Sequence, residues 1–94
     1  YKNLCYAETE KRNVMLHFEG QQQRIYKNMK EVSSLLLGQP QFACPHQSFV
    51  VNMAYVKSVE SLELVMTTGE HIPISQPKRK DFMMKLTDFW GDML

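Results

Sequence analysis

Turn-forming residues are spread along the whole chain and limit the length of the elements that it can form. Its four glycines and four prolines separate short apolar segments from one another. This pattern is typical of a mainly β domain. Because the chain has 94 residues, of which 44% are hydrophobic, we expect one domain over residues 1–94 with a modest core.

Alternating apolar residues predict where the strands lie. Val14, Leu16 and Phe18 recur with a period of two, and residues 19–21 form a turn to a return strand. The predicted strands cover residues 3–7, 14–18, 23–27, 55–59, 62–67 and 71–74, the predicted loops cover residues 8–12 and 39–47, and residues 48–52 fit either a strand or a helical turn.

One internal segment has the apolar period of a helix instead. Val32, Leu35 and Leu36 share one face of a helix over residues 29–37. Gly38 is placed to end this helix, because glycine favours the position after a helix C-terminus.

A second helix is predicted from Ser75 to the end of the chain. Ser75 suits the N-cap position, and Pro77 lies in the first turn, where its missing N–H is tolerated. The apolar stripe of this helix contains Phe82, Leu86, Phe89, Trp90 and Met93. We interpret the stripe as core packing. The residues expected to be largely buried are Phe42, Phe49, Val51, Leu64, Phe82, Leu86, Phe89 and Trp90.

The total charge does not by itself favour a nucleic-acid partner, but two basic clusters do. The net charge is +1 and the pI is about 8.0, whereas a dedicated binder usually lies above about 9. Lys78-Arg79-Lys80 stands at the start of the terminal helix, where cations oppose the helix dipole unless an anion binds. Lys11-Arg12-Asn13 stands on a loop. Either cluster could instead be a solvated run balanced by neighbouring acidic residues.

Residues 44–48 (CPHQS) combine a thiol, an imidazole and a carboxamide. Cys44 and His46 could form a nucleophile and its base, but no acidic residue is placed to orient the imidazole. The cysteines and histidines lack metal-ligand spacing, so we expect no metal, no cofactor and two free thiols. Base reading is a better interpretation, because Gln47 can bond adenine and His46 can donate to guanine or phosphate. A purely structural loop is the alternative.

Two segments resemble the motifs of one family. Residues 42–52 (FACPHQSFVVN) resemble the signature of LytTR domains, in which Phe, a basic residue, His, a polar residue, Ser, an aromatic residue, two apolar residues and Asn follow in order. Residues 69–75 (GEHIPIS) are similar to the family's closing hairpin. The resemblance runs over residues 3–86. It implies an elongated sandwich of short antiparallel sheets with one short internal helix and a C-terminal helix.

The resemblance also implies where DNA would bind. LytTR domains place loops in successive major grooves on one face of the duplex. By position, these loops are the one before the second strand, the His-containing loop and the start of the terminal helix. The residues expected to contact DNA are Lys11, Arg12, Asn13, His46, Gln47, Gln76, Lys78, Arg79 and Lys80. Ser48 and Asn52 are expected to act as scaffold.

Several positions depart from the family pattern. Cys44 and Gln47 stand where the family often has basic residues, and Gln76-Pro77 stands where Arg is common. Each departure removes a phosphate partner, so we expect affinity and salt dependence to be low for the family. Family members usually have one or two further strands before the position of Tyr1, and we expect these strands to be missing here.

The predicted function is sequence-specific binding of double-stranded DNA, without catalysis, as the output domain of a bacterial two-component transcription regulator. The expected setting is the cytoplasm, with a receiver domain in the parent chain and a dimer on paired DNA repeats. A membrane partner is not expected, because no apolar run approaches the length of a membrane span. The main alternative is a β-sandwich protein-interaction module without DNA binding. A thiol enzyme or redox sensor that uses Cys44 with His46 is a third class.

Overall fold

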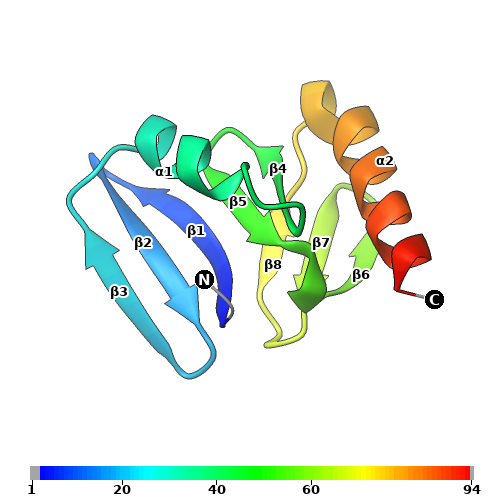
Figure 1. The fold of residues 1–94 in the computed structure, drawn as a ribbon, viewed down its shortest axis with the longest axis horizontal. Coiled ribbons are helices and arrows are strands. Elements are labelled where there is room, and N and C mark those ends of the chain that lie inside the picture. The colour runs from blue at the N-terminus through cyan, green and yellow to red at the C-terminus, as the bar shows by residue number, and fades with distance from the viewer. Residues whose placement is uncertain (1–2, 94) are drawn as a thin grey trace.

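The computed structural model describes residues 3–93, which form two antiparallel sheets and two α-helices (Figure 1). The five-stranded sheet contains, in spatial order, β3 (Gln21–Ile25), β2 (Asn13–Phe18), β1 (Leu4–Glu10), β5 (Phe49–Asn52) and β4 (Phe42–His46). The three-stranded sheet contains β6 (Val56–Glu60), β7 (Glu63–Met66) and β8 (His71–Pro73). The remaining elements are α1 (Met29–Leu36), the 3-10 turn η1 (Met53–Tyr55) and α2 (Gln76–Asp92). The predicted mainly β fold with two helices is confirmed.

The five-stranded sheet buries side chains on both of its faces. Tyr6 and Val51 are paired across β1 and β5 and belong to the core shared with the three-stranded sheet and α2. The next pair, Ala7 and Val50, belongs to the second core, beneath α1. Successive residues of a strand point to opposite faces, so β1 and β5 each contribute to both cores. The two helices therefore pack against different cores of the same domain.

A bulge near the start of β1 changes this alternation. Leu4 belongs to the core beneath α1, whereas Cys5 and Tyr6 both belong to the core shared with α2. The pairing of β1 with β2 shifts register between Leu4 and Tyr6. An extra residue at a bulge breaks the strict alternation of a strand, and this explains why two consecutive side chains enter one core.

Two segments that were predicted to be loops belong instead to strands. Strand β1 extends to Glu10, which leaves only Lys11 and Arg12 between it and β2. Strand β4 runs through Pro45, because β4 is an edge strand and an edge position can tolerate proline's missing N–H. A register shift opposite β5 between Ala43 and His46 accompanies that proline. Residues 49–52 form β5, so the strand alternative holds for that segment.

Helix α2 follows the predicted stripe only in part. Phe82 and Leu86 are fully buried and Phe89 is partly buried, but Trp90 is 36% exposed and Met93 65% exposed. The expected burial of Trp90 is therefore wrong. With 3.6 residues per turn, Trp90 lies about 80° around the helix from Phe82 and so falls at the edge of the stripe. Within residues 3–93, no helix is long and apolar enough to cross a membrane.

The packing of α2 predicts different costs for two truncations. Leu86 is 0% exposed, so Leu86→Ala should lower the free energy of unfolding by about 2–5 kcal/mol through lost burial and a cavity. Trp90→Ala removes more atoms from a half-solvated position and should cost clearly less. Urea denaturation of both variants measures the two costs. A Trp90→Ala loss as large as that of Leu86→Ala would contradict the observed position of α2.

Candidate nucleic-acid interface

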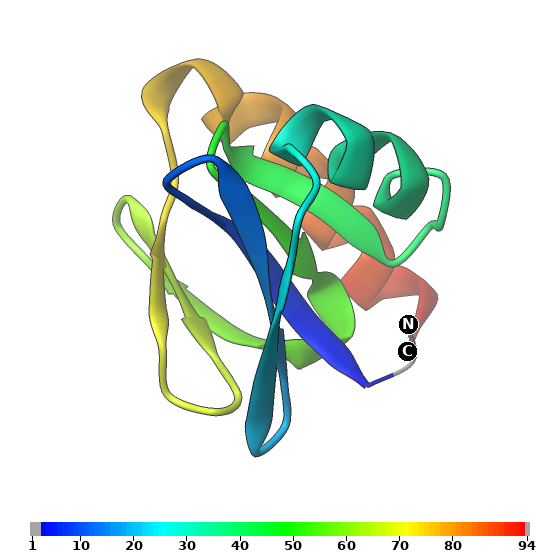
Figure 2. The same ribbon diagram turned by 90° about the vertical axis from the view of Figure 1, so that its left-hand side faces the viewer.

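Three segments that are distant in sequence lie along one edge of the molecule. They are the β1–β2 turn, the β4–β5 turn and the start of α2, and both views place them along the upper edge (Figures 1 and 2). The Thr9 amide donates to the Ser48 carbonyl at 2.9 Å, and the Ser75 amide donates to the Pro45 carbonyl at 2.9 Å. These two bonds connect the β4–β5 turn to its neighbour on each side. The three predicted DNA-contacting segments are thus brought together.

The β1–β2 turn carries unpaired positive charge. Lys11 and Arg12 are exposed, Lys11 has a left-handed φ of 57°, and Asn13 is half-buried at the start of β2. Within residues 3–93, neither cation forms an ion pair with a protein carboxylate. The tight turn therefore projects two cations beyond the end of the sheet.

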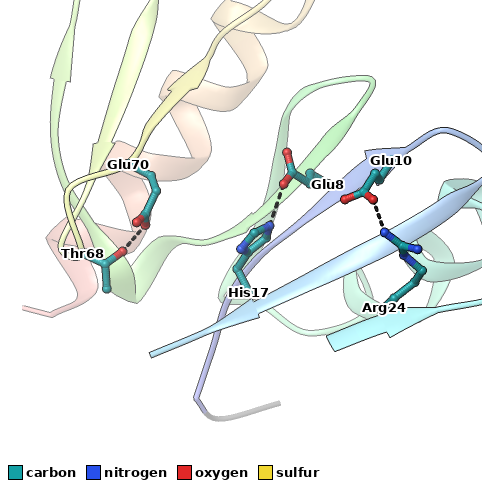
Figure 3. Close-up of polar contacts among 6 residues, drawn as sticks. All are labelled: Glu8, Glu10, His17, Arg24, Thr68 and Glu70. Atoms are coloured by element: carbon teal, nitrogen blue, oxygen red, sulfur yellow. Dashed lines mark hydrogen bonds and ion pairs between the residues drawn. The ribbon is translucent and has the colours of Figure 1, made fainter. Parts of the chain in front are cut away.

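The nearest carboxylates on β1 are already engaged across the sheet. Glu10 accepts from the Arg24 guanidinium on β3, and Glu8 lies 2.6 Å from Nε2 of His17 on β2 (Figure 3). The His17 ring also stacks on Tyr6 at a centroid distance of 4.2 Å. Because Glu10 is paired with the Arg24 cation, it offsets less of the charge of the turn than the sequence spacing suggested. The sequence suggested that Glu8 and Glu10 balance the charges of Lys11 and Arg12, and in the structure this balance is only partial.

The β4–β5 turn is held by hydrogen bonds to His46. The Ser48 amide donates to His46 Nδ1 at 3.0 Å, and the Cys44 thiol donates to the His46 carbonyl at 3.1 Å. The imidazole meets the Phe49 ring edge-on at a centroid distance of 5.7 Å. Gln47, between them, is exposed. The turn thus fixes the backbone around Gln47 while leaving its side chain free to contact a partner.

Asn52 is a scaffold residue, as predicted. Its side chain is 2% exposed; Nδ2 donates to the Leu4 carbonyl at 2.9 Å, and Oδ1 accepts from the Ala54 amide at 3.0 Å. Residues 52 and 4 are distant in sequence, so this one side chain joins the end of β5 to the start of β1. A buried amide that satisfies two backbone groups stabilises the sheet and the turn that follows it.

Removal of the Asn52 amide should therefore destabilise the domain. Asn52→Ala leaves the Leu4 carbonyl and the Ala54 amide without these partners, at an expected cost of about 2–4 kcal/mol in the free energy of unfolding. Asn28→Ala is the matched control, because Asn28 Oδ1 caps α1 by accepting from the Glu31 amide at 2.9 Å in an exposed hydrogen bond. This substitution should cost about 1 kcal/mol. Chemical denaturation compares them, and equal costs would argue against the scaffold role.

The start of α2 combines cations with the positive end of the helix dipole. Ser75 occupies the N-cap, but its side chain makes no capping bond, and the first turn contains no acidic residue. Gln76, Arg79 and Lys80 are exposed, while Lys78 is half-buried. The Ser75 and Lys78 amides already donate to the Pro45 and Ser75 carbonyls, and Pro77 has no N–H. The helix dipole and the basic side chains are therefore what favour an anion at this end of the helix.

The cysteines do not form the arrangement that a thiol enzyme needs. Cys5 and Cys44 are free thiols. The Cys44 thiol contacts the His46 carbonyl, whereas the imidazole Nδ1 contacts a backbone amide. Cys44 and His46 are thus not arranged as a nucleophile and its base. Among residues 3–93, no three His, Cys, Asp or Glu side chains are grouped to hold a metal ion.

The different burial of the two thiols predicts different reactivity. Burial above all, and then the charges of Glu19 and Glu70, raise the pKa of the Cys5 thiol. The thiolate is the reactive form, so alkylation of Cys5 by iodoacetamide should await unfolding of the domain, whereas half-buried Cys44 should react faster. Mass spectrometry of Cys5→Ala and Cys44→Ser variants, with and without urea, measures each rate. Fast alkylation of native Cys5 would contradict its burial.

The fold and this edge define a class of protein: a small β domain with a cationic turn and a basic helix start along one edge. The chain belongs to the LytTr DNA-binding domain family, whose model matches residues 1–87. This family is defined by binding to DNA and not by catalysis.

A solved structure agrees with this assignment at the level of the fold. It is a LytTr DNA-binding domain from Bacillus cereus, whose parent is named as a methyl-accepting/DNA response regulator. The TM-score is 0.79 at 24% sequence identity, over 90% of this chain and 82% of that chain. No curated protein sequence is significantly similar to this chain.

Two residues that contribute to the edge were not identified from the sequence. Thr9 joins the first turn to the second through its backbone, and Arg24 engages Glu10 from β3. A backbone hydrogen bond does not require a particular residue type, so nothing in the sequence could have identified the role of Thr9. The Glu10–Arg24 pair could have been found only by assigning the register of both hairpins.

Proposed function

We propose that this domain binds double-stranded DNA sequence-specifically, as the output domain of a bacterial transcription regulator. The observation that carries the proposal is the joining of three turns by the Thr9–Ser48 and Ser75–Pro45 hydrogen bonds. These bonds hold the three segments together along one edge, whereas unconnected segments could move independently. The proposed contacts are Lys11, Arg12, Asn13, His46, Gln47, Gln76, Lys78, Arg79 and Lys80.

The dimensions of the domain support insertion of its loops into successive major grooves. The longest principal extent of the molecule is 35 Å, and one turn of B-DNA is about 34–36 Å. The three segments are spread along this longest axis, which is horizontal in Figure 1. A duplex lying along the edge would therefore present one groove to the β1–β2 turn and the next to the start of α2.

The side chains suggest two kinds of contact. Lys78, Arg79 and Lys80 stand at the positive end of a helix dipole, which suits phosphate oxygens of any sequence. Gln47 is uncharged and exposed on a fixed turn, and its amide can bond the N6 and N7 atoms of adenine together. Affinity and sequence preference are thus assigned to different segments of the edge.

The family suggests the biological setting of this activity. We propose that the parent protein acts in the bacterial cytoplasm, that a receiver domain in the same chain controls the domain, and that two copies bind paired repeats. Response regulators couple an input domain to an output domain in this way, and the similar Bacillus cereus structure is named as part of such a regulator.

The division of contacts predicts distinct effects of two kinds of substitution. Gln47→Ala should cost roughly 1–3 kcal/mol on a selected site, because one base contact is lost, and little on scrambled DNA. Lys78→Ala and Arg79→Ala should each weaken both duplexes alike and reduce the salt slope by about 1, because one phosphate contact is lost. Fluorescence anisotropy titrations at several salt concentrations, on a site selected from random duplexes, measure these effects.

Two matched variants control for the loss of an exposed amide or cation elsewhere on the surface. Gln22→Ala removes an exposed amide from β3, and Lys57→Ala removes an exposed cation from β6; neither should change binding. Equal losses on both duplexes for Gln47→Ala would remove Gln47 from base reading. Salt slopes that do not change in either basic variant would exclude the start of α2 from the interface. Absence of binding by the wild type would favour the protein-interaction module.

A further inference from the structure

A row of side chains crosses four strands of the five-stranded sheet. His17 on β2 is opposite Tyr6 on β1. Two residues further along β1, Glu8 is opposite Phe49 on β5, which is paired with His46 on β4. Residues opposite each other on paired strands point to the same face of a sheet, as do residues two apart on one strand. All five side chains are therefore on one face.

Three ring contacts run without interruption along this row. The His17 and Tyr6 rings stack with their centroids 4.2 Å apart and an interplanar angle of 13°. The Tyr6 and Phe49 rings lie 6.3 Å apart at 42°. The Phe49 and His46 rings lie 5.7 Å apart at 77°. Stacked and edge-on ring pairs stabilise a structure beyond the apolar area that they bury, so the row forms a packing path from β2 to the β4–β5 turn.

A carboxylate and burial hold the far end of the row in place. Glu8 Oε1 lies 2.6 Å from His17 Nε2, which fixes the direction of the imidazole (Figure 3). Tyr6 is 5% exposed. Burial above all, and then the charge of Glu8, raises the pKa of Tyr6 to about 12. The phenol is therefore neutral at physiological pH and packs as a ring in contact with both His17 and Phe49.

The β4–β5 turn needs this packing because the backbone pairing beside it is interrupted. The pairing of β4 with β5 shifts register between Ala43 and His46, and Pro45 within this interval has no N–H to donate. β4 is also an edge strand, with a neighbour on one side only. The strand ladder therefore restrains the end of β4 less than a regular pair would, and the contact with Phe49 adds to the Ser48 bond in fixing the His46 ring.

From this arrangement we propose that His17, which lies outside the DNA-contacting segments, is a positioning residue for DNA binding. It acts through Tyr6 and Phe49 on the β4–β5 turn, and Glu8 holds it in place. This inference rests on the proposed function. The row ends at the turn that carries Gln47 and not at the basic start of α2. His17 should therefore affect sequence preference more than the binding of phosphates.

Two substitutions of His17 separate the ring contact from the bond to Glu8. His17→Ala removes both, whereas His17→Phe keeps a ring over Tyr6 and loses the bond alone. His17→Ala should bind the selected DNA site roughly 2- to 10-fold more weakly than the wild type, the range that corresponds to one aromatic pair. Its binding to scrambled DNA should change little. His17→Phe should restore most of the lost affinity in the same anisotropy titrations.

A matched control and a second break in the row complete the binding test. His71→Ala is the control, because His71 also pairs with a carboxylate, that of Glu63 at 3.0 Å, but lies in the three-stranded sheet. In the described part of the chain His71 makes no ring contact, so this variant should bind both duplexes like the wild type. Phe49→Leu keeps apolar bulk but removes the central ring, and it should show the selective loss expected of His17→Ala.

A measurement on the free domain distinguishes positioning from a general effect on stability. The NMR signals of the His46 ring protons depend on the place of the imidazole relative to the Phe49 ring, because ring currents shift nearby protons. Without DNA, these signals should move in His17→Ala and return toward their wild-type positions in His17→Phe. A purely structural role would lower the free energy of unfolding and leave the His46 signals of the native domain in place.

Four results would overturn the inference: unchanged His46 signals in His17→Ala, wild-type affinity of that variant for the selected site, equal losses on both duplexes, or binding by His17→Phe as weak as that of His17→Ala. In the last case the loss would come from the freed charge of Glu8 and not from the ring. Failure of the wild type to bind the selected site would instead overturn the proposed function, and the NMR comparison would still test whether His17 positions the turn.

Discussion

The pairing of β1 on both of its sides is the constraint on which the rest of the structure depends. β1 pairs with β2 along one edge and with β5 along the other. It thus joins two hairpins whose turns reach the same end of the sheet. Because both faces of β1 are buried, a slip of one residue would exchange Tyr6 and Ala7 between the two cores. Burial therefore determines the register, and the register positions both turns.

The elements with clear periodicity could be predicted from the sequence. The alternation in β2 and the apolar face of α1 are local signals, and both elements occur as expected. The end of β1 and all of β4 were not predicted, because charged Glu8 and Glu10 and the proline at position 45 obscure a strand pattern. Their strand conformation comes from pairing with distant segments, which no local window contains.

The sequence identified the candidate segments, but not the contacts that join them. Charge and the family resemblance identified three loops, and the structure places all three along one edge. The bonds that join the loops run from the backbone amides of Thr9 and Ser75 to the backbone carbonyls of Ser48 and Pro45. Any residue can supply such a carbonyl, and any residue except proline can supply such an amide. The His46 imidazole is likewise engaged by a backbone amide, that of Ser48 in its own turn. Residue identities alone therefore show which groups are available but not which of them are already engaged.

The near-neutral total charge is compatible with DNA binding because the charged side chains are unevenly distributed over the structure. Glu8 and Glu10 are engaged by His17 and Arg24 within the sheet, while the cations of the proposed interface form no ion pair in the described part of the chain. The total of +1 thus includes carboxylates that are partly offset away from that edge.

This distribution has a consequence for how such a domain would discriminate between sequences. Counterion release grows with the number of phosphates neutralised, and it contributes to binding of any DNA sequence. A domain with few phosphate contacts therefore gains little affinity for random DNA. Contacts to base edges from the β4–β5 turn then account for a larger share of the affinity for the correct site. The departures from the basic family pattern at Cys44, Gln47 and Gln76 would thus reduce nonspecific binding more than specific binding.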